Sequence, residues 1–259
     1  MSNTMLKGLM APMAALAMAL LLAACSSAEP VKQPVNFPSA TFVPGFSPEL
    51  EAGQWWYLGP RGGMKPGGLA PGGGGLGLQL IEVERIPTMR AIAGVRPFIA
   101  VREADRPLGV TPFLAYSWKL IAPDLEPEEH HAVSLAIGFR DTNTPLVVST
   151  VQSADPAKAG PALLPPHDRV LFLSFGPSAL QRGTVTPVEG APNRVHYTVR
   201  GGRENLSRWF TELLDLSDLH RAIWPEKTIN TVRISFLGVS VEGDKQGHYG
   251  DFVGIDLTR

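Results

Sequence analysis

Carboxylates are the side chains of this sequence whose possible chemistry is easiest to name. Two carboxyl groups that flank a glycosidic bond can hydrolyse it, one as proton donor and the other as base or nucleophile. The acidic residues that stand near strand ends or in turns are Asp141, Glu242, Asp244, Asp251 and Asp256. Sequence separation does not tell which of them meet in space, and ordinary solvated loop positions also explain them.

A second cluster, Glu128-Glu129-His130-His131, has the residue types of a metal site. Zinc requires three or four converging ligands, whereas adjacent residues of a strand point to opposite faces. Prolines in the preceding segment 123–127 indicate a loop. We therefore interpret the cluster as solvated loop charge and predict no metal and no cofactor.

Catalysis by a serine nucleophile is not indicated. The nucleophile elbow of many serine hydrolases has the pattern Gly-x-Ser-x-Gly, which does not occur in the sequence. The segment 238–243 comes nearest, but its spacing is wrong and it alternates like a strand. We assign no catalytic residue from the sequence.

Three consecutive aromatic residues, Trp55, Trp56 and Tyr57, are the best candidates for ligand contact. Aromatic faces stack on sugar rings while polar neighbours fix the orientation. In a strand, Trp55 and Tyr57 would share one face and Trp56 the other. One face would belong to the core, so core packing is the alternative. Arg140 and Asp141, at the end of a predicted strand, are a second candidate of the same type.

A glycine-rich stretch follows the aromatic residues, with ten glycines in residues 59–77. Glycine has the largest backbone entropy cost on folding, so this composition predicts a flexible loop. A phosphate-binding loop would end in Gly-Lys-Ser/Thr before a helix. Here Lys65 precedes Pro66, which excludes the nucleotide-binding interpretation.

The rest of the chain alternates with a period of two. Polar or small residues alternate with apolar ones, and Gly, Pro, Asn and Asp bound the runs, as is typical of strands. The expected strands lie in residues 76–83, 98–101, 113–121, 132–139, 146–151, 170–175, 195–199, 232–236 and 253–257. Strands without long intervening helices predict an all-β fold, an antiparallel β-sandwich of the jelly-roll type.

One or two short helices are also expected. Leu206, Phe210 and Leu213 have helical spacing, which predicts a helix over 205–214 with Asn205 as a possible cap. Residues 215–223 could continue as a second helical turn or as a loop, which Trp224 and Pro225 would end.

The N-terminus has the layout of a secretory signal, with Lys7 before the apolar run 9–22. The run is short for a membrane-spanning helix. Leu22-Ala23-Ala24-Cys25 resembles the lipobox of bacterial lipoproteins. That resemblance implies removal of residues 1–24, acylation of Cys25, and a firm membrane anchor. Ser26 in place of aspartate resembles the signal for the outer membrane, facing the periplasm, in Gram-negative bacteria.

We predict a lipidated tether over 25–45 and one β-sandwich domain over 46–259. Cys25 is the single cysteine, so no intramolecular disulfide can form. The whole chain has 23 basic and 24 acidic residues, and removal of the signal would take away Lys7 alone among the charged residues. This balance gives no basic face for nucleic acid.

The C-terminal third carries a family resemblance. Arg208-Trp209-Phe210, Trp224-Pro225 and the strands in 229–236 and 250–257 follow one another in a recognisable order. This order resembles the closing hairpin of galactose-binding-like jelly rolls, the fold of many carbohydrate-binding modules, and a set of bacterial envelope proteins on the same sandwich. Such jelly rolls often hold a structural calcium, but no loop dense in Asp and Asn can be assigned to it here.

These observations predict a membrane-anchored envelope lipoprotein that acts as a non-catalytic binding module for a glycan or another envelope polymer. The first alternative is a structural or assembly lipoprotein whose partner is another envelope protein. An enzyme that acts on glycans is the third, and fold alone does not decide among them.

Overall fold

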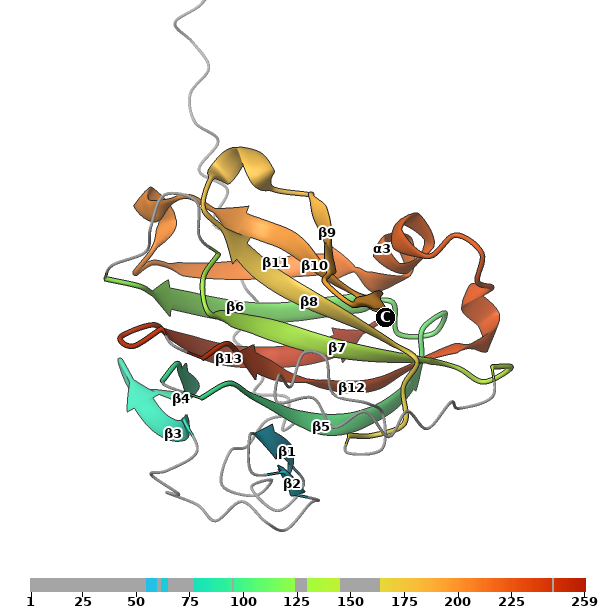
Figure 1. Cartoon of the computed structure of the whole chain (residues 1–259), viewed down its shortest axis with the longest axis horizontal. Coiled ribbons are helices and arrows are strands. Elements are labelled where there is room, and N and C mark those ends of the chain that lie inside the picture. The colour runs from blue at the N-terminus through green and yellow to red at the C-terminus, as the bar shows by residue number, and fades with distance from the viewer. Residues whose placement is uncertain are drawn as a thin grey trace, which may run out of the picture. The chain divides into compact units, whose positions relative to one another are not determined.

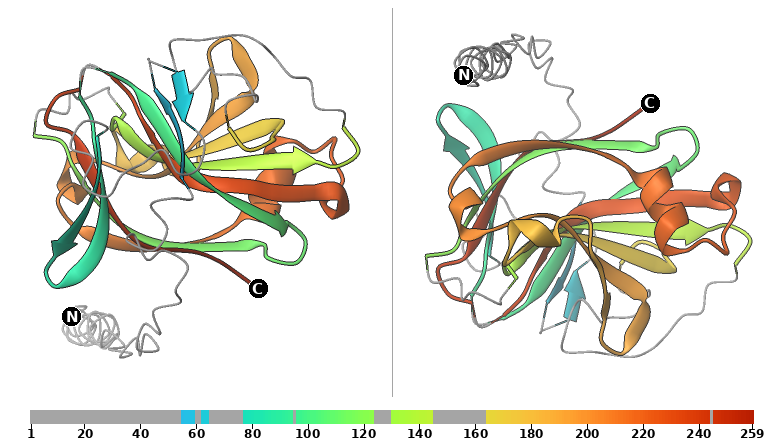
Figure 2. Two further views of the ribbon diagram at one scale, coloured as in Figure 1. Left: turned by 90° about the horizontal axis from the view of Figure 1, so that it is seen from below. Right: turned by 90° about the horizontal axis from the view of Figure 1, so that it is seen from above.

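The computed structural model describes residues 55–59, 62–64, 77–94, 96–123, 130–144, 164–243 and 245–259. They form two β-sheets that face each other (Figures 1 and 2). This confirms the predicted β-sandwich. The expected strand over 146–151 lies outside the described residues, as do Cys25 and most of the glycine-rich stretch.

The larger sheet has eight strands in the order β2-β1-β5-β12-β7-β8-β10-β9. In chain order they are β1 (Trp55–Gly59), β2 (Gly62–Met64), β5 (Phe98–Pro107), β7 (Val133–Asp141), β8 (Arg169–Gly176), β9 (Val185–Val188), β10 (Ala191–Gly201) and β12 (Val232–Val241). Its pairs are antiparallel except for β8 and β10, which run parallel. The sequence pattern did not predict that parallel pair.

The smaller sheet has five strands in the order β11-β6-β13-β4-β3. They are β3 (Leu78–Val83), β4 (Ile86–Ile92), β6 (Phe113–Ile121), β11 (Trp209–Asp215) and β13 (Tyr249–Thr258). All described pairs in this sheet are antiparallel.

The main core lies between the two sheets. Strand β6 alternates between buried and half-buried side chains, and Leu114, Tyr116 and Trp118 are among its inward residues. Strand β7 contributes Leu135, Ile137 and other residues of the same face. Aromatic edge-to-face contacts, such as that between Tyr116 and Trp118 at 5.5 Å, fix the packing.

A second apolar cluster lies on the opposite face of the larger sheet. It contains Leu58, Ile99, Val101, Ala136, Leu164, Val170, Phe172 and Phe236. Strand β7 is therefore buried on both faces along most of its length, which explains why even its small-residue face is out of solvent.

The helix predicted over 205–214 was wrong, because Trp209–Asp215 form strand β11. The helical alternative for 215–223 is confirmed, since the α-helix α3 spans Leu216–Ile223. Asp215 caps it, because its carboxylate accepts hydrogen bonds from the backbone N–H groups of Ser217 and Asp218. No helix in the described part of the chain is long and apolar enough to cross a membrane.

Candidate functional site

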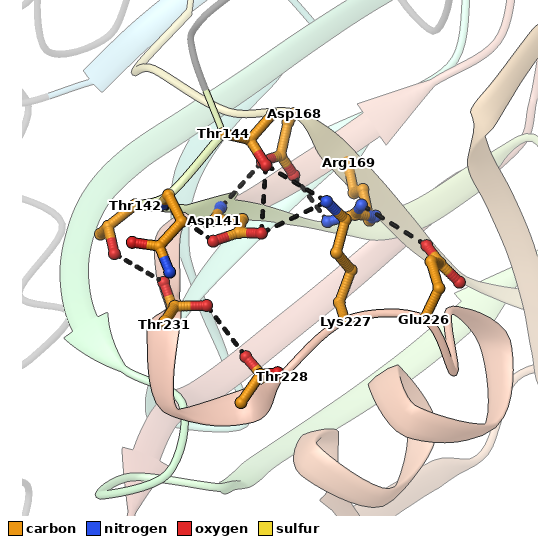
Figure 3. Close-up of polar contacts among 10 residues, drawn as sticks. Asp141, Thr142, Thr144, Asp168, Arg169, Glu226, Lys227, Thr228 and Thr231 are labelled. Carbon is orange, nitrogen blue, oxygen red and sulfur yellow. Dashed lines mark hydrogen bonds and ion pairs between the residues drawn. The ribbon is translucent and has the colours of Figure 1, made fainter.

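A polar cluster lies where β7 ends and β8 begins (Figure 3). The segment that follows α3 contributes its remaining side chains. We call it the Asp141–Asp168 cluster; its members are Asp141, Thr142, Thr144, Asp168, Arg169, Glu226, Lys227, Thr228 and Thr231.

Asp141 ends β7 and organises the turn that follows. Its carboxylate accepts hydrogen bonds from the backbone N–H of Asn143 (3.0 Å) and the hydroxyl of Thr144 (3.1 Å). An aspartate that binds the backbone two residues ahead is a common turn-forming device. Lys227 Nζ lies 3.3 Å from Asp141 Oδ2 and donates to Thr144 Oγ1 at 3.2 Å. Asp141 is thus almost fully enclosed.

Asp168 stands beside it, immediately before the neighbouring strand β8. The backbone N–H of Asp141 donates to Asp168 Oδ2 at 2.8 Å. Asp168 also pairs with Arg169 through a 3.0 Å contact. The register that places Phe139 opposite Arg169 brings these two carboxylates, 27 residues apart, to the same end of the sheet.

The segment after α3 closes the cluster. Glu226 pairs with Arg169 at 3.6 Å. The backbone carbonyl of Thr231 accepts hydrogen bonds from both the backbone N–H and the hydroxyl of Thr142. These contacts fix the two acidic side chains relative to their cationic partners.

The two carboxyl groups have pKa values displaced in opposite directions. Burial raises the pKa of Asp168 above its ordinary value, against the effect of its hydrogen bond from Asp141. Burial acts the same way on Asp141, but hydrogen bonds from Asn143, Thr231, Thr144 and Lys227 outweigh it and lower the pKa of Asp141 to about 2. The two neighbouring carboxyl groups therefore differ in acidity.

His220 of α3 lies next to this cluster and is completely buried. Its ring contacts Phe139 and Trp224, each at 5.1 Å between centroids. Neither ring nitrogen has a hydrogen-bond partner among the described residues. Burial, together with the charge of Arg169, lowers its pKa to about 4, so the imidazole is neutral at pH 7.

The sequence-derived candidates separate into several groups. Asp141 belongs to the cluster, and Arg140, its neighbour on β7, lies on the other face of the strand. Trp55, Trp56 and Tyr57 belong to strand β1, which pairs with β5. Their side chains lie outside the described residues, so their role stays a prediction.

The histidine cluster has a structural explanation. His131 donates to the carbonyl of Ile121 and accepts from the N–H of Val133, and its ring stacks on His248. Its nitrogens are therefore occupied. Glu128 and Glu129 lie outside the described residues. Within the described ranges no three His, Cys, Asp or Glu residues are grouped as a metal site would require.

Of the remaining predicted carboxylates, Asp251 has a different partner. Asp251 is fully buried and forms a two-pronged ion pair with Arg90, at 2.6 and 2.9 Å. Asp244 lies outside the described residues. The residue that sequence reasoning missed is Asp168; its only signal was its place just before the buried strand β8.

Comparison with known proteins gives little at the sequence level. No family model matches the chain, and no curated protein matches it. Among solved structures, endoglucanase 3 of Trichoderma harzianum, from family GH12, resembles it with 7% identity and a TM-score of 0.35, over 69% of this chain and 83% of that chain.

Two xyloglucanases show a similar likeness. The family 12 xyloglucanase of Bacillus licheniformis has 9% identity and a TM-score of 0.35, covering 69% of this chain and 88% of its own. The xyloglucanase domain of NopAA from Sinorhizobium fredii, solved with cellobiose, has 11% identity and a TM-score of 0.30. The match covers 70% of this chain and 90% of that chain. At these values the likeness concerns the fold alone.

This comparison corrects the functional prediction. A jelly-roll resemblance led us to expect a non-catalytic module, or else an assembly protein, and not an enzyme. The solved structures named above are glycan-hydrolysing enzymes on a similar sandwich. The step from this fold to a non-catalytic role was therefore wrong.

Proposed function

We propose that this chain is a glycan-active hydrolase in which Asp168 donates the proton and Asp141 is the ionised partner. The observation that carries the proposal is the pair itself: two neighbouring aspartates, linked by a hydrogen bond from the backbone N–H of Asp141 to the Asp168 carboxylate, with pKa values displaced in opposite directions. The likeness to known hydrolases is too low to contribute.

The division of roles follows from the surroundings of each group. A general acid needs a raised pKa, so that it is protonated near the working pH. Desolvation shifts the pKa of Asp168 in that direction. The partner must remain negative beside the positive charge that develops on the sugar ring. Asp141 meets this requirement, because donors from four residues stabilise its charged form.

The exposed fractions of the two side chains agree with this division of roles. The Asp168 side chain is 16% exposed, whereas that of Asp141 is 6% exposed. The Glu226 side chain is 59% exposed and lies on the solvent side of the cluster, next to Arg169. A glycosidic oxygen that approaches past Glu226 would meet Asp168 first, as the proton donor requires.

The decisive test is hydrolysis by the purified full chain of soluble glycans, including xyloglucan, cellulose-derived oligosaccharides and peptidoglycan fragments. We expect release of reducing ends by the wild type, and a loss of at least about a hundredfold in Asp168→Asn. Asp218→Asn is the matched control, since Asp218 is exposed and pairs only locally with Arg221. No release from any glycan, or equal loss in the control, would overturn the proposal.

We further propose that Cys25 is acylated and anchors the protein to the cell envelope, in the outer membrane if the cell is Gram-negative. The lipobox-like residues 22–25 support this, and Ser26 supports the outer-membrane destination. Metabolic labelling with an alkyne-tagged palmitate should mark the wild type and leave Cys25→Ala unlabelled. Label on the variant would contradict the assignment.

A further inference from the structure

Three neighbouring strands of the larger sheet each carry an arginine near the same end. Arg106 lies at the end of β5, Arg233 at the start of β12 and Arg140 at the end of β7. These three strands are neighbours in the sheet (Figure 1). Arg140 and Arg233 lie directly opposite each other in the strand register, whereas Arg106 lies opposite Ile234, a residue of the main core.

The contacts of Asp105 define the centre of this group. Arg233 Nε donates to Asp105 Oδ1 at 2.6 Å, and Arg233 also donates to the Asp105 backbone carbonyl at 2.8 Å. The hydrogen bond from Arg233, with the charges of Arg140 and Arg106, lowers the pKa of Asp105 despite partial desolvation. The Asp105 side chain is 67% exposed, so the group opens to solvent.

Arg140 and Arg233 form an unfavourable cross-strand pair of like charges. They lie directly opposite each other on antiparallel strands, where like charges destabilise the pair. In addition, Arg140 Nε is buried and has no acceptor among the described residues. A buried donor without a partner is rare and requires an explanation such as a bound group.

The backbone around Asp105 is also unusual. Asp105 has a φ of 44°, in the left-handed region that non-glycine residues seldom adopt. The register between β5 and β12 shifts at the same place. Backbone conformations of this kind often occur at binding sites. Here the bulge turns the Asp105 carboxylate toward Arg233.

We propose that Arg140 and Arg233 form a binding site for a phosphate dianion, either free or as the monoester of a sugar. The two guanidinium groups and the Asp105 carboxylate carry a net charge of +1 in a chain whose total is −1. A phosphate dianion offsets that charge and relieves the repulsion between the two arginines. Guanidinium groups recognise phosphate by paired hydrogen bonds.

This site is distinct from the Asp141–Asp168 cluster, because Arg140 and Asp141 point to opposite faces of β7. The proposal therefore does not depend on hydrolysis. It also gives Arg140 a different ligand chemistry from the aromatic stacking considered at the sequence level.

The test is calorimetric titration of the full chain, held in neutral detergent, with inorganic phosphate. Glucose 6-phosphate and unphosphorylated glucose are parallel arms at equal ionic strength. We expect saturable binding of phosphate and none of glucose. Comparable affinity for the two phosphates indicates free phosphate as the ligand, and tighter binding of glucose 6-phosphate indicates a monoester.

Three variants make the result specific. Arg140→Gln should weaken phosphate binding about tenfold, the effect of losing one charge-assisted contact. Asp105→Asn should strengthen it, because the competing negative charge is removed. Arg182→Gln, a change at an exposed arginine, should leave it unchanged. Absence of saturable phosphate binding, or wild-type affinity in Arg140→Gln, would overturn the proposal.

Thermal unfolding separates a loss of phosphate binding from a loss of folding stability. Without phosphate, Arg140→Gln should unfold at or above the wild-type temperature, because it removes repulsion from Arg233. Phosphate should raise the wild-type midpoint by mass action and leave that of the variant nearly unchanged. A midpoint rise of equal size in both proteins would also count against the site.

Discussion

Arg200 of β10 and Glu212 of β11 join the two sheets through a 2.8 Å contact between Nε and Oε1. The Glu212 side chain is 4% exposed and lies in the interior, opposite Tyr116 in the strand register. The guanidinium group also stacks on Phe210, 3.8 Å from the ring centre. A charged pair therefore bridges the sandwich between the edge strand β11 of the smaller sheet and β10 of the larger one.

Arg200→Leu should destabilise the protein by about 3 kcal/mol, because it leaves the buried Glu212 without its counter-charge. The double variant Arg200→Leu/Glu212→Leu should recover most of that loss, since no buried charge remains. Urea unfolding of the two variants and the wild type measures both effects. Equal stability of the single and double variants would show that the pair does not act as a unit.

Gly238 is required by close backbone packing in the larger sheet. A Cβ atom at this position would overlap the carbonyl oxygen of Ala100 on the adjacent strand. We expect Gly238→Ala to lower the free energy of unfolding by about 1–3 kcal/mol. Gly94→Ala is the control, because a Cβ there meets no atom within 4 Å. Equal stability of the two variants would show that Gly238 does not lie this close to Ala100.

Buried histidines make stability depend on pH. The pKa values of His131, His167 and His220 are each lowered by burial to about 4. The unfolded chain takes up these protons near pH 6.5, whereas the folded protein does not until about pH 4. The unfolded state thus binds more protons in this window, so stability falls as the pH drops from 6.5 to 4.

His220→Leu should flatten this dependence by about 1.4 kcal/mol per pH unit, the share of one histidine. It should also cost little stability at pH 7, because it removes two ring nitrogens that have no partner in the described structure. Urea unfolding at several pH values between 6.5 and 4 gives the slope. An unchanged slope would mean that His220 is protonated in the folded state.

The Asp141–Asp168 pair predicts two separate titrations. In ¹³C NMR of the side-chain carboxyl groups, Asp168 should titrate above the ordinary aspartate range and Asp141 near pH 2. Asp168→Asn should remove the upper transition and leave Asp141 low, because its own donors remain. Two overlapping transitions near pH 4 would contradict the acid–base assignment.

Strands with simple alternation were predictable from the sequence. Val133, Leu135, Ile137 and Phe139 alternate without interruption and form β7 as expected. Strand β11 was not, because Glu212 occupies an inward position between Phe210 and Leu214. That buried charge hides the period of two, and the remaining apolar residues happen to have helical spacing. Only the partner Arg200, on another strand, explains it.

The candidate site was predictable in part. Asp141 was recognised as a polar residue at a strand end, but Asp168 was not, because only the pairing of β7 with β8 brings the two together. The same limit applies to Arg140 and Arg233, which are separated by most of the C-terminal half and meet through register alone.

Hydrolysis in water labelled with ¹⁸O tests the central claim most directly. The wild-type chain and Asp168→Asn would be incubated with the same glycan panel, and the new reducing ends analysed by mass spectrometry. The account predicts ¹⁸O in the reducing ends released by the wild type and almost none with Asp168→Asn. Absence of ¹⁸O with every glycan, or equal incorporation by both proteins, would contradict it.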